Sequence, residues 1–141
     1  MLLAAALLLL SLDPAQVRKQ ALAGNKAAQW EAAQLVYQGK LKGVSKKQAE
    51  QWRREAAERG VAQAQYDLGL DLLDATAAED EPRRFEGLAW LALAAEKKLP
   101  IALKRWEIVL EKLGGEELEM VEQKAKSLRL LAVQPSKIAV Q

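Results

Sequence analysis

The side chains that most often perform catalysis or bind metals are scarce in this sequence. Its 141 residues contain no histidine and no cysteine, so the commonest general base is absent, as are thiolate nucleophiles, disulfides and thiolate zinc ligands. None of the four serines, at positions 11, 45, 127 and 136, stands in a context that activates a serine nucleophile. Gly114-Gly115 is typical of a helix break, not of a phosphate loop. We therefore predict no catalytic residue, no metal site and no cofactor, and expect the protein not to be an enzyme.

Two charged runs are the remaining candidates for ion or ligand binding. The "EDE" of residues 79–81 lacks the spaced oxygen ligands and the glycine of a calcium loop, which favours a solvated loop. The run "KLKGVSKK" at 40–47, followed by Arg53 and Arg54, could contact phosphates or an acidic partner, although such runs are more often solvated. The whole chain has a formal net charge of only +2. We therefore expect no nucleic-acid partner.

The first twelve residues, "MLLAAALLLLSL", are almost entirely apolar. They are too few to span a bilayer as a helix, so we expect no stable membrane span. They match the apolar core of a secretory signal, although no basic residue precedes them and no clear cleavage site follows. The alternative is an apolar N-terminal helix that packs on the first repeat. We expect an exported protein, periplasmic or secreted, and a cytoplasmic one if residues 1–12 are not a signal peptide.

Helix start and stop signals divide the rest of the chain into seven helical segments. Asp13 before Pro14, and Ser45 three residues before Gln48, are typical of helix starts. Glycines stand where several of these helices should end, and no segment alternates as a strand does. The predicted helices are 14–23, 26–38, 45–60, 62–73, 82–97, 100–113 and 116–131, with a polar loop at 74–81, one domain over 13–133 and a flexible tail over 134–141.

The chain also repeats itself. A shift of 36 residues superposes one helix pair on the next, and a shift of 38 repeats the second helix of the pair, with the two extra residues falling in the 74–81 loop. A recurring helix pair of this length is the sequence form of an α-solenoid. The aligned pairs are Ala21/Ala57, Gly24/Gly60, Ala28/Ala64, Gln29/Gln65, Trp30/Tyr66, Ala33/Gly69, Trp52/Trp90, Ala56/Ala94, Ala57/Ala95 and Ala64/Ala102.

The spacing of small and aromatic residues resembles the Sel-one-like repeat (SLR) family, a branch of the tetratricopeptide superfamily. The resemblance covers about residues 13–113 and implies an all-α fold, a short right-handed α-solenoid of antiparallel helix pairs with about seven helices. One departure is Lys98, which stands where the pattern ends in glycine. The residues that match the repeat signature are Gly24, Ala28, Gly43, Val44, Ala49, Trp52, Ala56, Ala57, Gly60, Ala64, Leu68, Gly69, Trp90, Ala94 and Ala95.

The alanine pairs have a physical role in this fold. Small residues where helices cross let the backbones approach, so Ala56 and Ala57 should face the neighbouring helices. Trp52 and Trp90 lie one turn before each alanine pair and should fill the remaining space.

The resemblance also implies a concave face, lined by the first helix of each pair, at which partners bind. Aromatic residues at matching positions are plausible anchors for a bound peptide, although Trp30 and Tyr37 are equally well explained as core residues. We expect the partner to be another protein or a peptide, bound by an envelope adaptor or scaffold. The alternative is a structural or regulatory subunit of a larger assembly; the chain is then not a monomer. The predicted groove residues are Trp30, Gln34 and Tyr37 in the first unit and Gln63, Tyr66 and Leu70 in the second.

Overall fold

The computed structural model describes residues 13–75 and 81–134, and every regular element within them is helical. The expected leader at 1–12, most of the expected loop and the tail beyond 134 lie outside these residues. The chain divides into two compact units, residues 1–53 and 54–141, with the boundary inside helix α4. In the part of the chain that is described, no helix is long and apolar enough to cross a membrane.

The first unit holds α2 (Pro14–Leu22), α3 (Lys26–Tyr37) and the start of α4 (Lys46–Glu58). Each helix begins at a side chain that accepts a hydrogen bond from a free backbone N–H, as helix N-termini require. The Oδ1 of Asp13 accepts from the N–H of Gln16 at 2.8 Å, and the Oγ of Ser45 accepts from Gln48 at 3.1 Å. Both predicted starts are therefore confirmed. Asn25 caps α3 in the same way, which the sequence reasoning missed.

The core of the first unit is built mainly from alanines around one large ring. Trp52 of α4 is buried with Val17, Ala21, Ala28, Ala32 and Leu41. The half-buried side chains of Leu35, Val36 and Val44 pack against this cluster. Because alanine side chains are short, the helices approach closely and the indole ring of Trp52 fills the space that remains.

Four helices end in the same backbone conformation, in which one residue adopts a left-handed φ. Gly24, Gly39 and Gly60 have φ values of +92°, +71° and +93°. At each of them, two N–H groups past the helix donate to carbonyls of the last turn, the pattern of a Schellman motif. Lys98 ends α6 with the same pair of bonds and a φ of +63°. The lysine therefore occupies the position that the repeat pattern gives to glycine.

The second unit is organised around the crossing of α5 (Ala62–Ala75) and α6 (Glu81–Glu96). The two helices run antiparallel, since Gly69 lies against Leu91 while Leu73 lies against Gly87. A Cβ placed on Gly69 would lie 2.9 Å from the carbonyl oxygen of Gly87, and one on Gly87 would lie 3.0 Å from that of Gly69. The two backbones therefore touch at this point, and only glycine fits on both sides.

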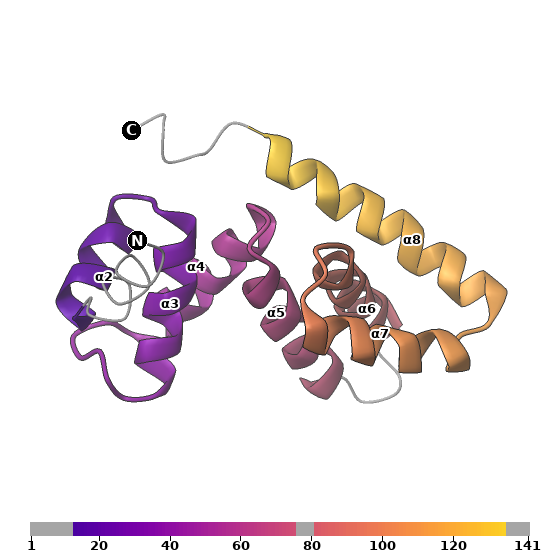
Figure 1. Ribbon diagram of the computed structural model, residues 1–141, viewed down its shortest axis with the longest axis horizontal. Helices are drawn as coiled ribbons and strands as arrows, with labels where there is room; N and C mark the ends of the chain where they lie inside the picture. The colour runs from indigo at the N-terminus through magenta and orange to yellow at the C-terminus, as the bar shows by residue number, and fades with distance from the viewer. Residues whose placement is uncertain (1–12, 76–80, 135–141) are drawn as a thin grey trace, which may run out of the picture. The chain divides into compact units, whose positions relative to one another are not determined.

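Helices α7 (Pro100–Lys112) and α8 (Gly115–Arg129) complete the second unit, with a short 3-10 turn at Leu130–Val133. Both pack against α6, and Figure 1 shows them diverging from the turn that joins them. The core between α6 and α8 includes Val121, Ala125 and Leu128 on the α8 side. The predicted seven helices are confirmed, and their ends differ from the predicted ones by one or two residues, the last being shorter because it tightens into the 3-10 turn.

Candidate partner-binding surfaces

The first half of the predicted groove lies on one side of α3. Trp30, Gln34 and Tyr37, here called the α3 face, are one helical turn apart in sequence and lie opposite the buried Ala28 and Ala32. Trp30 and Gln34 are half-buried, and the side chain of Tyr37 is 39% exposed. These exposures place the three side chains between the core and the solvent, as contact residues require.

A cation lies over the aromatic end of the α3 face. The guanidinium carbon of Arg53 is 5.3 Å from the centroid of the Tyr37 ring, within the range of a cation–π contact. Both residues belong to the first unit. The contact leaves part of the tyrosine ring accessible, since Tyr37 is 39% exposed.

The second half of the predicted groove needs a correction, because Tyr66 is a core residue. Its side chain is only 8% exposed and packs with Leu91, Ala94, Ala95 and Ala102. The physical reason is that the cluster around the ring comes mainly from α6, which supplies Leu91 and the alanine pair, while α7 adds Ala102. On the same helix, Gln63 is exposed, whereas Leu70 is half-buried against the same cluster. The matching positions Trp30 and Tyr66 therefore differ in exposure.

Most residues of the repeat signature are buried, whereas Gly24, Gly43, Val44 and Gly60 are not. Among the described residues, the only buried polar ones are Gln29 and Gln65, which align at the 36-residue shift. The Nε2 of Gln65 donates to the carbonyl oxygen of Ala57 at 3.1 Å, so it satisfies a carbonyl at the end of α4. The sequence comparison found this pair but gave it no role. The buried members of the signature are Ala28, Ala49, Trp52, Ala56, Ala57, Ala64, Leu68, Gly69, Trp90, Ala94 and Ala95.

Helix α7 carries exposed aliphatic side chains on two sides. Its buried side packs against α6 through Ala102, with Trp106 and Val109 partly buried. On its flanks, Ile101 is 56% exposed and Ile108 is 53% exposed, and Leu103 and Leu110 are exposed as well. Large aliphatic groups gathered on an exposed helix are typical of a contact surface. Sequence periodicity did not single out this surface, because α7 is apolar on more than one side.

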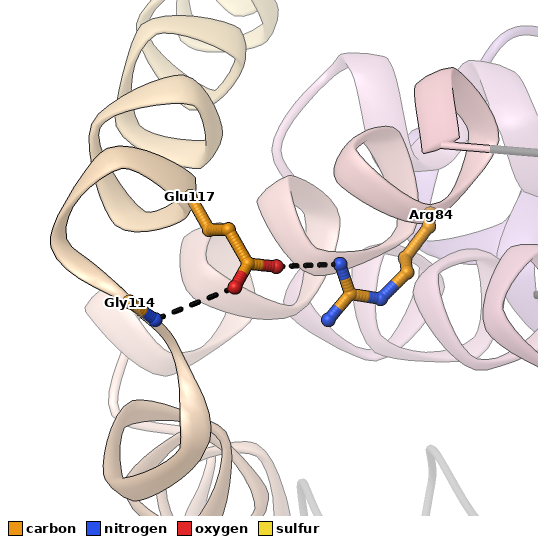
Figure 2. Close-up of polar contacts among 3 residues, drawn as sticks. All are labelled: Arg84, Gly114 and Glu117. Carbon is orange, nitrogen blue, oxygen red and sulfur yellow. Dashed lines mark hydrogen bonds and ion pairs between the residues drawn. The ribbon is translucent and has the colours of Figure 1, made fainter.

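An ion pair fixes the start of α8 to α6. The Nη1 of Arg84 donates to Glu117 Oε2 at 2.9 Å, and the other carboxylate oxygen faces the N–H of Gly114 (Figure 2). The Arg84 hydrogen bond and then the Gly114 N–H hold the pKa of Glu117 below its ordinary value. Arg129 and Glu96 form a second ion pair between the same helices. These contacts position α8 and have the character of structural ties.

The charged runs do not form a metal site in the part of the chain that is described. No group of three carboxylates or other metal-binding side chains is assembled there. Glu81 begins α6, whereas residues 79 and 80 of the acidic run lie outside the description. The basic run 40–47 connects α3 to α4, and part of it lines a cavity.

With this geometry in place, comparison with known proteins identifies the fold. The chain matches the crystal structure of c5321, a protective antigen present in uropathogenic Escherichia coli strains that displays an SLR fold. The TM-score is 0.63 at 26% sequence identity, over 88% of this chain. The chain has an SLR-like fold.

The SLR-like chain spans 28% of the length of the solved antigen. No protein-family model and no curated protein matches the sequence. The likeness confirms the all-α solenoid architecture that the repeat pattern predicts. Helical repeat proteins of this kind typically bind other proteins, which is the coarse function that the fold supports.

Proposed function

We propose that this SLR-like protein is an adaptor that binds a partner protein through the α3 face. The observation that carries the proposal is that Trp30, Gln34 and Tyr37 lie on one side of α3 at the margin of the core, with Tyr37 39% exposed. A partly exposed tyrosine that already makes a cation–π contact is a suitable aromatic anchor, and aromatic anchors dominate binding energy at interfaces. The helices are already formed, so a bound segment meets a surface that needs little ordering.

Tyr37 is the residue to test, because its ring is the most exposed of the three. A photo-crosslinking amino acid at position 37 should give a discrete crosslinked product with another protein in native cells. The same group at position 47, an exposed lysine of the first unit that is not part of the α3 face, is the matched control. A partner crosslinked at position 37 and absent at position 47 supports the proposal. Equal products at both positions, or none at position 37, would overturn it.

The affinity for the partner should also depend on Tyr37. Once the crosslinked partner is identified, Tyr37→Ala should weaken its binding by more than about ten-fold, the cost of removing an aromatic anchor. Tyr66→Phe is the control, because the ring at position 66 belongs to the core and its hydrophobic packing is retained. Unchanged affinity in Tyr37→Ala would remove the α3 face from the interface.

The exposed aliphatic side chains of α7 favour a second candidate role, as a subunit of a larger assembly. Its exposed Ile101 and Ile108 flank the face that packs on α6, and solenoid helices normally cover such side chains with a neighbouring repeat. Size-exclusion chromatography with light scattering separates the two candidates. A monomer that unfolds cooperatively supports the adaptor, whereas a stable oligomer that Ile108→Lys dissociates supports the subunit.

The proposal includes export to the bacterial envelope, periplasmic or secreted. It is supported by the apolar run over residues 1–12 and is compatible with the likeness to a bacterial antigen. Fractionation of cells that express the full chain should place a shortened product outside the cytoplasm. Deletion of residues 2–12 should retain the protein in the cytoplasm. A full-length cytoplasmic product of the intact gene would contradict export.

A further inference from the structure

A cavity in the first unit lies between α2 and the loop that follows α3. Its volume is about 590 Å³, within the range of cavities that hold ligands. It is separate from the α3 face, since none of the three residues of that face lines it. The lining residues are Pro14, Ala15, Arg18, Lys19 and Leu22 of α2 and Lys40, Leu41 and Lys42 of the loop.

The charge of this cavity, here called the basic cavity, is of one sign. Within the described part of the chain, its lining includes four cationic side chains, Arg18, Lys19, Lys40 and Lys42, and no carboxylate. Among the described residues, none of the four has a carboxylate partner, whereas Arg54, Arg84 and Arg129 in the second unit each form an ion pair. Residues 1–12 contain no acidic side chain. Like charges gathered around one concavity raise the local positive potential and attract anionic groups.

The cavity also has an apolar wall. Leu41 is almost completely buried and belongs to the core of the first unit, while Leu22 is 64% exposed. The Nη1 of Arg18 would lie 3.9 Å from a Cβ placed on Gly43, so the guanidinium reaches from α2 towards the loop. Cationic groups therefore stand beside an exposed leucine within one cavity.

This combination fits a peptide better than a phosphate or a nucleic acid. The backbone N–H of Gln16 at the start of α2 already donates to Asp13 at 2.8 Å, so it is not available to cradle a phosphate. No aromatic side chain lines the cavity on which a base could stack. A segment that places carboxylates beside an apolar side chain complements both parts of the lining.

We propose that the basic cavity binds an acidic segment of a partner protein. Carboxylates of the segment pair with Arg18, Lys19, Lys40 and Lys42, and an apolar side chain of the segment packs on Leu22. This is a second interaction surface, which goes beyond the α3 face proposed above.

The test uses the full chain and a fluorescent peptide built from alternating pairs of Glu and Leu, with binding followed by anisotropy. Arg18→Glu/Lys42→Glu should weaken binding by about ten-fold or more, because two charge-assisted contacts are reversed. The matched control is Lys46→Glu/Lys47→Glu, which makes the same charge change on exposed lysines that do not line the cavity. Binding should also weaken as salt is added. Circular dichroism confirms that each variant is folded, and Arg18→Gln/Lys42→Gln repeats the test without introducing acidic groups.

Each outcome of this test either supports or overturns the proposed binding of an acidic segment. Loss of binding in the cavity variants and its retention in the control support the proposal. An equal loss in both pairs would show a diffuse basic field in place of a site, and would overturn it. Binding of inorganic polyphosphate or of phosphatidylglycerol vesicles in preference to the peptide would also overturn it. Tyr37→Ala should leave peptide binding unchanged, so failure of this proposal and failure of the α3 face can be told apart.

Discussion

The contact between Gly69 and Gly87 makes the packing of the second unit unusually sensitive to one methyl group. The substitution Gly69→Ala adds a Cβ that would lie 2.9 Å from the carbonyl oxygen of Gly87 and 3.2 Å from the backbone nitrogen of Leu91. Both are backbone atoms of α6, so no side-chain rotation relieves the contact. The two helices must therefore separate by about half an ångström.

Two opposing free-energy contributions determine how much Gly69→Ala changes the stability. In a helix interior, alanine is more favourable than glycine by about 0.5–1 kcal/mol. Forcing an extra carbon into a packed crossing costs about 1–3 kcal/mol. The steric term is the larger, because its contacts involve backbone on the opposite helix. We expect Gly69→Ala to lower the free energy of unfolding by about 1–2 kcal/mol.

Urea denaturation followed by circular dichroism measures this change. The matched control is Gly115→Ala, since Gly115 begins α8 and a Cβ there has no neighbour within 4 Å. The control should be as stable as the parent or slightly more so. The double variant Gly69→Ala/Gly87→Ala should be less destabilised than the sum of the two single changes, because one separation of the helices relieves both contacts.

One result would refute the expected loss of stability in Gly69→Ala. Gly69→Ala would then be as stable as the parent or more stable. Helix propensity would in that case determine the free energy of unfolding, and the backbones of α5 and α6 would not be in contact. Strict additivity in the double variant would show that the two glycines act independently.

Three further predictions concern other helix contacts. Lys98→Gly should raise the free energy of unfolding by about 0.5–1.5 kcal/mol in a urea titration, because lysine is strained at a φ of +63°; a loss of stability would contradict this. Ala57→Leu should lower it by about 1–3 kcal/mol, since Ala57 is fully buried, and an unchanged melting temperature would show that the site has room. Arg84→Gln should raise the pKa of Glu117 in an NMR titration. Because that pKa is lowered in the folded state, the stabilisation is present above the ordinary pKa of the carboxyl and is lost as the pH falls through the lowered one. The stability difference between parent and Arg84→Gln should therefore shrink in acid, and a constant difference would exclude the ion pair as its cause.

Much of the helix pattern could be predicted because its signals are local. Asp13 and Ser45 each cap the N–H group three residues ahead, so neither cap depends on the rest of the fold. Gly24 and Gly60 end their helices for the same kind of reason, since a left-handed φ is a property of one residue and its neighbours. The 36-residue repeat added the helix pairing, and with it the solenoid fold.

The candidate surfaces were less predictable, because exposure depends on what packs from outside a helix. Trp30 and Tyr66 occupy matching positions, yet side chains of α6 and α7 enclose Tyr66 and make it a core residue. Likewise, the basic run 40–47 looks like a solvated loop until α2 brings Arg18 and Lys19 to the same cavity.

The sequence by itself determined where the helices begin and end and that they pair as a repeat, because capping, φ preference and periodicity act over a few residues. Only the tertiary structure decided which side chains remain available to a partner. Gly87 shows the reason most directly. Considered within α6 alone, it is a glycine that lowers helix propensity, whereas in the folded chain it allows the backbone of Gly69 to lie against α6. Packing between distant segments is a steric property of the folded chain, and neither segment encodes it alone.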